Sequence, residues 1–298
     1  LAALLRDAGY DAIACGNIGT PWCEAVDRPR SANGRRAYVV ELSSYQLESV
    51  STLRCDVALL LNVAPDHLDR HGTFEAYLGA KLRIFERQTD RDLAVVSADD
   101  PAVGLFSSSS KRARFSTRRP LDHGAWLAGE YFLASIDRAT KSYATRKDLA
   151  LGGDHNAANA AAALAAAVKF GATPESVRKT FSEFRALPHR CALVRKVGGV
   201  SWFDDSKATN VDAALRALAG FPPRRVWMIL GGRPKGDDFK KLAPELDVRA
   251  KGVLLIGEAS AAAAEALSVA RCRAPLEHCE TLETAVALAA RKAASGDS

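Results

Sequence analysis

Two polar segments in the first third of the chain contain residue types that bind metals and phosphates. Glu41-Leu-Ser-Ser-Tyr-Gln-Leu-Glu48 directly follows the apolar run Tyr38-Val39-Val40, and Asn62-Val-Ala-Pro-Asp-His-Leu-Asp-Arg-His71 follows the next apolar run. In an open parallel sheet, ligands bind beyond the carboxyl ends of the strands. Glu41 is therefore a candidate ligand for a hard cation, and His67 is a candidate ligand for a metal or a phosphate. Taken singly, Glu41 could be an ordinary strand-end acid and His67 a structural histidine.

Lys81 interrupts the apolar stripe of a helix predicted over Thr73–Arg87. Helical periodicity places it on the face that also contains Phe74, Tyr77, Leu78 and Phe85. The side chain could snorkel to solvent. However, partial burial lowers the pKa of a lysine, which can then react as the free amine. Such an amine can take up carbon dioxide and become a carbamate, an anionic oxygen ligand for a cation.

A fourth candidate lies at the start of an alanine-rich helix. Gly153-Asp-His-Asn-Ala-Ala-Asn159 places Asn156 and Asn159 three residues apart, on one helix face, with Asp154 expected to cap a helix that ends near Phe170. Paired amides can contact an adenine edge. Asparagine near a helix start is also common capping chemistry, so both interpretations stay open here.

The last third of the chain contains two more polar segments that follow predicted strands. Leu187-Pro-His-Arg190 precedes Asp204-Asp-Ser-Lys-Ala-Thr-Asn210, in which hydroxyls, amides and a helix start suit an anionic group. An acid in this segment can orient a ribose hydroxyl or a metal-bound water. Gly231-Gly-Arg-Pro-Lys-Gly-Asp-Asp-Phe239 is a glycine-rich loop, which is weak evidence by itself. Lys235 at its tip could meet a carboxylate or a phosphate.

The elements that would position these residues alternate between strands and helices, which predicts a parallel α/β architecture in two domains. The boundary is expected near 187–190, giving domains at 1–188 and 189–298. Strands are predicted at 37–42, 56–63, 93–97, 200–203, 226–231 and 252–257, and residues 126–134 read as a small antiparallel excursion. The basic cluster formed by Lys111–Arg114 with Arg118 and Arg119 is expected to lie in a solvated loop.

Composition narrows the class of protein. The 298 residues carry a net charge of +6, with basic and acidic residues interleaved, so nucleic-acid binding is disfavoured and small anionic substrates suit the charge. No apolar run reaches the length of a membrane span, and a cytoplasmic location is expected. The six cysteines have no CxxC pair, which favours reduced thiols. A zinc site at Cys272, His278 and Cys279 would lack a fourth ligand.

Taken in order, these segments resemble the Mur ligase family, from Gly16-Asn-Ile-Gly-Thr-Pro21 to Lys235-Gly-Asp-Asp-Phe239. The resemblance implies a central ATPase domain of the P-loop type followed by a Rossmann-like C-terminal domain. It also implies ATP-dependent formation of an amide bond through an acyl-phosphate. The sequences at ELSSYQLE and DSKATN favour the ligase that adds D-glutamate to UDP-N-acetylmuramoyl-L-alanine. A monomer is expected.

The same resemblance implies roles for individual residues. The UDP-sugar would face Asn17, Ser43 and Gln46. Two magnesium ions are implied, one bound by Glu41 and the second by His67 and a carbamylated Lys81. Adenine would be contacted by Asn156 and Asn159, the ATP phosphates by Arg190, and the ribose by Asp205. The amino acid and the intermediate would be positioned by Lys207, Thr209 and Lys235.

The sequence also departs from the family pattern. A GxxxxGK[ST] phosphate loop is absent and is expected just before Leu1, together with a UDP-binding domain; a D-glutamate-closing segment is expected after Ser298. Without these parts the chain alone is expected to be inactive. Asp204 stands where the family usually has Asn. The alternatives are another Mur ligase, a folylpolyglutamate synthase, a non-catalytic module that binds a nucleotide or UDP-sugar, and a nucleic-acid-binding protein.

Overall fold

The computed structural model describes residues 1–29, 35–103, 108–135, 139–185, 188–233 and 238–298. The chain forms two units, Leu1–Arg185 and Ala186–Ser298, each with hydrophobic cores of its own. None of the helices in the described residues is long and apolar enough to cross a membrane.

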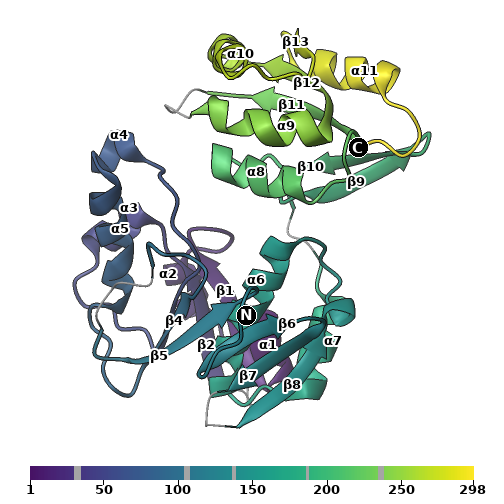
Figure 1. The fold of residues 1–298 in the computed structure, drawn as a ribbon. Coiled ribbons are helices and arrows are strands. Elements are labelled where there is room, and N and C mark those ends of the chain that lie inside the picture. Colours follow the sequence, from purple (N-terminus) through teal and green to yellow (C-terminus); the bar gives the residue numbers. More distant parts are fainter. Residues whose placement is uncertain (30–34, 104–107, 136–138, 186–187, 234–237) are drawn as a thin grey trace. The chain divides into compact units, whose positions relative to one another are not determined.

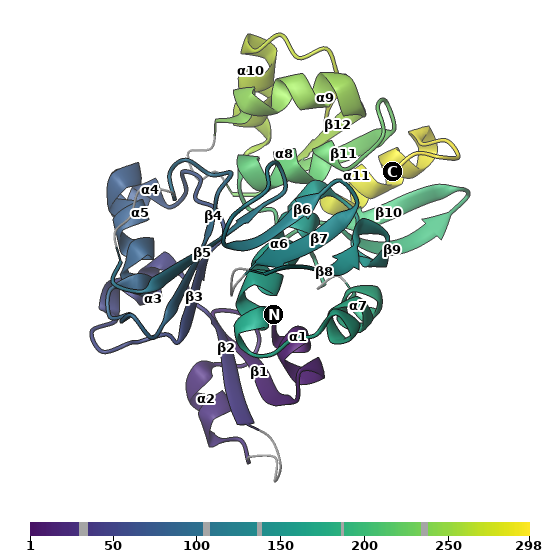
Figure 2. The same ribbon diagram turned by 60° about the horizontal axis from the view of Figure 1, so that its bottom comes forward.

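The first unit is built on a six-stranded sheet. Its strands follow chain order: β3 (Val57–Leu60), β4 (Leu93–Ser97), β5 (Lys111–Ser116), β6 (Gly124–Ala128), β7 (Tyr131–Ser135) and β8 (Thr140–Thr145). The pairs from β3 to β6 are parallel, and those from β6 to β8 are antiparallel (Figure 2). A separate two-stranded parallel sheet joins β1 (Tyr10–Gly16) to β2 (Arg35–Glu41).

All five residues of strand β4 are buried, which explains why its sequence is apolar almost throughout. Leu93 and Val95 belong to the core formed with α6 (Asp154–Lys169), whereas Ala94 and Val96 belong to the core formed with α5 (Phe74–Leu82). A parallel strand covered on both faces has no polar side to alternate with.

Helices therefore lie on both faces of this sheet. The α5 side also carries α3 (Ser44–Ser49) and α4 (Leu68–His71) (Figure 1), and the short helix η1 (Arg83–Phe85) follows α5. On the α6 side, α1 (Ala2–Asp7) packs against α6 and α7 (Pro174–Glu183). The remaining elements of this unit are α2 (Trp22–Asp27) and η2 (Arg146–Asp148).

The second unit has a parallel sheet of β11 (Val226–Gly231), β12 (Ala250–Ile256) and β13 (Leu276–His278), and an antiparallel pair, β9 (Ala192–Val197) and β10 (Val200–Asp204). Val253 and Leu255 of β12 face the core that includes α8, α9, η3 and α10, and Leu254 faces α11. The sheet thus separates two helical layers. The helices are α8 (Val211–Ala219), η3 (Phe239–Leu242), α9 (Ala243–Arg249), α10 (Ser260–Val269) and α11 (Leu282–Lys292).

The predicted α/β class with parallel sheets is confirmed, and so is the antiparallel excursion, which is the β6–β7 hairpin. The loop prediction for Lys111–Arg114 is wrong. These residues belong to β5, where Ala113 and Phe115 are buried in the α6 core while the alternate side chains are basic. The prediction that Asp154 caps its helix is also wrong: Gly153 is the N-cap, with a φ of 83°, and Asp154 is the first helical residue.

Candidate active site

The carboxylate of Glu41 lies at the carboxyl end of β2, in register with the end of β1. Gly16 pairs with Glu41, and a Cβ on Gly16 would lie 2.3 Å from the Glu41 carbonyl oxygen, so the two strand ends approach as only glycine allows. Asn17 follows immediately: its backbone N–H donates to the Glu41 carbonyl (2.8 Å) and its side-chain amide donates to Glu41 Oε1 (3.1 Å). The predicted residues Asn17 and Glu41 are therefore in direct contact, and Asn17 fixes the carboxylate.

His67 is held in an unusual backbone conformation at the start of α4. Its φ of 53° is left-handed, and its N–H donates to Asp66 Oδ1 (2.9 Å). The ring nitrogen Nδ1 lies 3.2 Å from the Tyr45 hydroxyl. An imidazole that donates from Nδ1 to this hydroxyl keeps the Nε2 lone pair available for a cation.

The buried side chain of His71 supports the contact between Tyr45 and His67. Its Nε2 lies 3.0 Å from Ser44 Oγ, and its Nδ1 lies 3.2 Å from a carboxylate oxygen of Glu48. Glu48 also accepts from Arg70 (2.9 Å). These bonds join α3 to α4, and thereby hold Tyr45 and His67 on neighbouring helices.

Lys81 lies on α5 within the same neighbourhood. Its ammonium is half-buried, with Nζ 4.9 Å from the ring centroid of Tyr77. Burial lowers the pKa of Lys81, and the carboxylates of Asp66 and Glu41 oppose this shift. Burial, together with Asp66 and Tyr45, also raises the pKa of Tyr77 to about 12. Lys81 is therefore close enough to Glu41 and Asp66 for their charges to act on its ammonium.

This cluster offers anionic oxygen and imidazole donors, but it is not a complete cage of protein ligands. Within the described residues, no three His, Cys, Asp or Glu side chains group closely enough to hold a metal ion. The donor chemistry nevertheless suits Mg²⁺, which commonly takes one or two carboxylates and completes its shell with waters and substrate phosphates.

Ser43 and Gln46 make a capping box at the start of α3. The Ser43 N–H donates to Gln46 Oε1 (2.9 Å), and the Gln46 N–H donates to Ser43 Oγ (3.2 Å). Both residues were predicted to face a sugar substrate. Here they order the helix that presents Tyr45 to His67.

The two asparagines predicted to contact adenine lie at the start of α6. Asn156 donates its side-chain amide to the Gly152 carbonyl (2.7 Å), and Asn159 is exposed one turn further on. Asn156 therefore makes the local helix-start bond that the sequence left open.

In the second unit, the segments around Arg190 and Asp205 are joined to each other. Asp205 Oδ1 accepts the Cys191 N–H (2.8 Å), and the Lys207 N–H donates to the His189 carbonyl (3.0 Å). His189 and Cys191 have φ values of 64° and 46°, so this turn is held in left-handed backbone on both sides of Arg190.

Cationic and hydroxyl side chains of these segments are open to solvent. Arg190, Lys207 and Thr209 are exposed, and Asp204 accepts from His189 Nδ1 (2.6 Å). Asn210 accepts the Ala213 N–H as the N-cap of α8. Two hydrogen-bonded segments of the second unit, one before β9 and one after β10, thus contain Arg190, Asp205, Lys207 and Thr209.

Two further predictions concern the second unit. Lys235 lies outside the described residues. Of the zinc candidates, Cys272 contacts Asp247 (3.5 Å) and His278 contacts Ser260 (2.8 Å), and the described residues hold no group of metal ligands there.

Sequence reasoning missed three residues that shape the first cluster. Asp66 and Tyr45 stand inside the two motifs from which Glu41 and His67 were chosen. Tyr77 was identified only as an apolar stripe residue. Tyr77 lies four residues before Lys81, and this helical spacing is the signal that could have predicted their contact.

The two units are α/β folds with polar residues at the ends of parallel strands, and comparison with known sequences assigns the family. The chain belongs to the Mur ligase family: residues 26–167 match the Mur ligase middle domain, and residues 189–298 match the Mur ligase glutamate ligase domain. It is 40% identical over 297 residues to UDP-N-acetylmuramoylalanine--D-glutamate ligase from Koribacter versatilis, covering 99% of this chain and 64% of the relative. The same-named protein from Pelotomaculum thermopropionicum is 36% identical over 299 residues, with 100% and 65% covered.

Solved structures support the fold. MurF from Acinetobacter baumannii has a TM-score of 0.72 at 17% identity, over 97% of this chain and 66% of that chain. MurF ligase from Thermotoga maritima in complex with ADP has a TM-score of 0.66 at 17% identity, over 99% and 71%. The chain spans just under two thirds of the length of the curated relatives described above.

Proposed function

We propose that this chain provides the ATP-binding part (1–188) and the C-terminal, amino-acid-binding part (189–298) of a ligase that joins D-glutamate to UDP-N-acetylmuramoyl-L-alanine in the cytoplasm. The observation that carries the proposal is the cluster of Asn17, Glu41, His67 and Lys81 beside the carboxyl ends of parallel strands. The names of the 36–40% identical relatives support this choice of substrates.

The reaction proceeds in two displacements. The L-alanine carboxylate attacks the γ-phosphorus of ATP, ADP leaves, and an acyl-phosphate forms. The D-glutamate amine then attacks the acyl carbonyl, and phosphate leaves as the amide bond forms and the amine loses a proton. Bound Mg²⁺ supplies neutralisation of the phosphate charge during these steps.

The residues of the first unit bind and orient the reactants. Glu41, fixed by Asn17, would hold one Mg²⁺. His67, oriented by Tyr45, would hold a second Mg²⁺ together with a carbamate on Lys81. A free ammonium at Lys81 would repel a cation, and a carbamate reverses that charge and offers oxygen ligands.

Substrate contacts are assigned to the surrounding residues. Asn17, Ser43 and Gln46 face the UDP-sugar, and adenine lies against Asn156 and Asn159. In the second unit, Arg190 contacts the phosphates and Asp205 the ribose. Lys207, Thr209 and Lys235 position D-glutamate. The enzyme acts as a monomer and requires neither a membrane nor nucleic acid.

The test is phosphate release by an enzyme containing this segment, supplied with ATP, Mg²⁺, UDP-N-acetylmuramoyl-L-alanine and one amino acid at a time. D-Glutamate should support release, and L-glutamate, L-lysine and D-alanine should not. Equal release with another amino acid would overturn the substrate assignment. Retained activity in Glu41→Ala would overturn the assigned site.

A further inference from the structure

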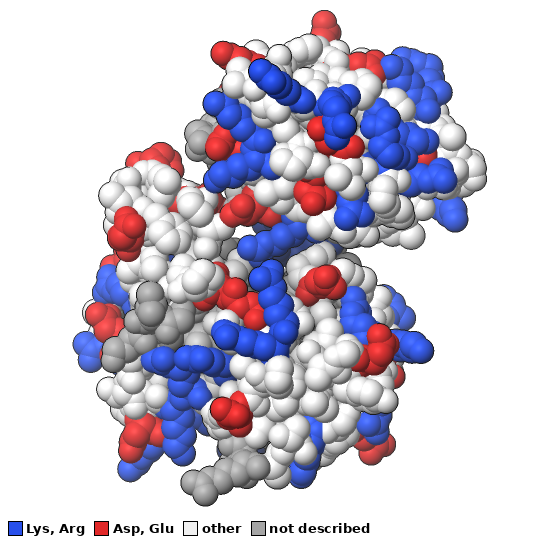
Figure 3. Space-filling view, in the orientation of Figure 1, with Lys and Arg blue, Asp and Glu red and all other residues white. Residues whose placement is uncertain are grey.

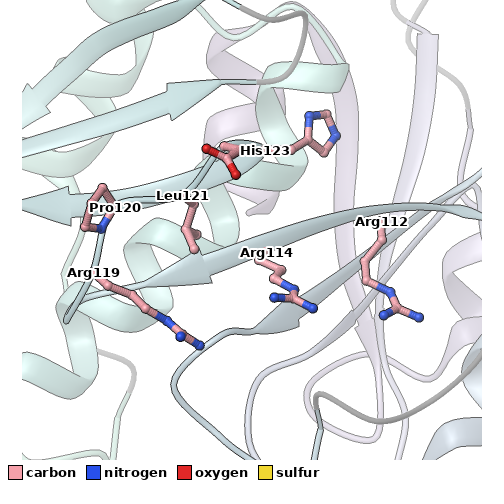
Figure 4. A pocket seen from close by; sticks show the side chains of 7 residues that line it. Arg112, Arg114, Arg119, Pro120, Leu121 and His123 are labelled. Carbon is pink, nitrogen blue, oxygen red and sulfur yellow. The ribbon is translucent and has the colours of Figure 1, made fainter.

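An arginine-lined hollow lies on the first unit, formed by strand β5 and the turn that leads to β6 (Figure 4). It measures about 370 Å³ and is lined by Arg112, Arg114, Arg119, Pro120, Leu121, Asp122 and His123. Figure 4 shows the three arginine side chains extending to the same side of β5, with His123 directed away from them. None of these residues belongs to the proposed active site.

Strand geometry places the arginines together. Arg112 and Arg114 are two residues apart on β5, so they share one face of the strand, about 7 Å apart along it. The opposite face carries Ala113 and Phe115, which are buried against the α6 core. The basic face cannot turn inward without exposing that core, so it is fixed toward the hollow.

The backbone around the arginines is held tightly. The Arg114 N–H donates to the His123 carbonyl (3.2 Å), and a Cβ on the paired Gly124 would lie 1.8 Å from the Arg114 carbonyl oxygen. Ser116 Oγ accepts the N–H groups of Arg118 and Arg119 (both 3.0 Å) while donating to Asp99 (2.7 Å). The guanidinium of Arg119 also donates to the carbonyl of Ala98. This positioning limits the entropy that a ligand must remove on binding.

The positive charge of the hollow is only partly balanced. Other arginines of this unit pair with carboxylates, such as Arg36 with Asp11 (2.7 Å) and Arg54 with Asp92 (2.9 Å). Across the described part of the chain, no such ion pair includes Arg114 or Arg119. Among the described residues that line the hollow, Asp122 is the one acidic residue. On the face drawn in Figure 3, basic and acidic side chains are interspersed within each unit.

We propose that this hollow binds a small multivalent phosphate anion of the pyrophosphate type. Guanidinium groups present planar, forked donors that match phosphate oxygens, and donors spaced along a strand can contact two phosphoryl groups at once. A dicarboxylate has fewer oxygens at each end and satisfies fewer of these donors.

The proposal is tested with the 298-residue chain and pyrophosphate as the probe. Calorimetric titration in about 0.15 M KCl, with EDTA present to exclude divalent cations, should show saturable binding. Arg114→Gln and Arg119→Gln should each weaken it about tenfold or more. Arg118→Gln is the matched control, since it removes the same charge from an exposed residue outside the lining, and it should change affinity by less than about twofold.

Other outcomes decide against the proposal. Equal weakening by all three substitutions would show general charge attraction only, and succinate binding as tightly as pyrophosphate would contradict the phosphate class. Absence of saturable binding by the unaltered chain would overturn the site. Glu41→Gln should leave pyrophosphate affinity at the hollow unchanged. A failure of the hollow proposal can therefore be distinguished from a failure of the proposed active site. Circular dichroism and urea unfolding should confirm that each variant is folded.

Discussion

The ammonium of Lys81 lies over the ring of Tyr77, with Nζ 4.9 Å from the ring centroid. The two residues are one helical turn apart on α5. The lysine is partly buried there, and burial lowers its pKa. A cation above an aromatic face is stabilised by the ring quadrupole. Burial instead destabilises the charged form and lowers the pKa of Lys81, so its free amine is populated at lower pH than in an exposed lysine. That is the form that can react with carbon dioxide.

The carbamate role of Lys81 predicts the behaviour of two variants. In an active ligase containing this segment, Lys81→Ala should reduce turnover by roughly 100-fold or more, because an oxygen ligand for the cation is lost. Acetate should restore part of the activity by supplying a carboxylate in the vacated space. Lys81→Arg should be inactive although it keeps the charge, since a guanidinium does not form the carbamate. Near-normal turnover of Lys81→Arg, or failure of acetate to rescue Lys81→Ala, would favour a snorkelling lysine instead.

The carbamate should also be visible without turnover. Carbamate forms from the free amine, so its amount should rise with pH, and the lowered pKa of Lys81 moves that rise to lower pH than for an exposed lysine. A ¹³C signal from labelled bicarbonate should appear in the unaltered chain and be missing from Lys81→Arg. A signal of equal size in both proteins would place the carbamate on another amine.

Tyr45→Phe tests whether the hydroxyl orients His67. Removing the 3.2 Å contact to Nδ1 should weaken the apparent Mg²⁺ affinity about tenfold, with little change in turnover at saturating Mg²⁺. Activity measured against Mg²⁺ concentration separates the two effects. The substitution should not unfold the protein, since Tyr45 is exposed. An unchanged Mg²⁺ dependence would mean that His67 is oriented by other contacts or does not hold the ion.

Much of the fold and part of the site could be predicted from the sequence because both follow from local patterns. Continuous apolar runs predicted β4 and β12, and polar residues directly after such runs identified Glu41 and His67. The left-handed φ of His67 and its contact with Tyr45 depend on three-dimensional packing between α3 and α4, for which the sequence has no local signal.

The error at β5 has a different physical cause. Arg112 and Arg114 alternate with Ala113 and Phe115, which is the pattern of a strand with one buried face. The basic residues Lys111, Arg112 and Arg114, with Arg118 and Arg119 nearby, masked this alternation, because charge runs are usually solvated. Pairing with β4 and β6 outweighed the low strand preference of these residues.

Trp126→Phe should barely change stability despite the complete burial of the indole. Trp126 is 4% exposed, and its Nε1 finds no hydrogen-bond partner within the described residues. Removing an unpaired buried donor removes its desolvation penalty, which offsets the smaller apolar area. The free energy of unfolding, measured in urea, should change by less than about 1 kcal/mol. Phe132→Ala on the neighbouring strand should lower it by about 3–5 kcal/mol. A loss above about 2 kcal/mol in Trp126→Phe would show that Nε1 has a partner.

Asp297 should anchor the last residues of the chain to the second unit. Its side chain is fully buried and accepts from Lys251 Nζ (2.7 Å to each oxygen) and from the Ala294 N–H (2.9 Å). The adjoining backbone accepts from the Ser201 N–H at Asp297 and from the Trp227 N–H at Ser298, which ties this segment to β10 and β11. Asp297→Ala should therefore lower the free energy of unfolding of the second unit by about 2–4 kcal/mol, measured by hydrogen exchange of the β11 and β12 amides. Glu277→Gln, which breaks the partly exposed pair with Lys292, should cost less than about 1 kcal/mol.

The contribution of Asp297 should depend on pH with a definite sign. Burial alone would raise the pKa of Asp297, but the Ala294 N–H and the Lys251 ammonium outweigh it and hold the pKa below the usual value. The ionised carboxylate thus stabilises the folded state fully above the unfolded pKa of about 4, and this stabilisation is lost as pH falls toward the folded pKa. The stability difference between the unaltered chain and Asp297→Asn should be constant from about pH 6 to 8 and shrink below about pH 4. A difference that grows on acidification would mean that the buried carboxyl is protonated at neutral pH, and Lys251 would then lack its anionic partner.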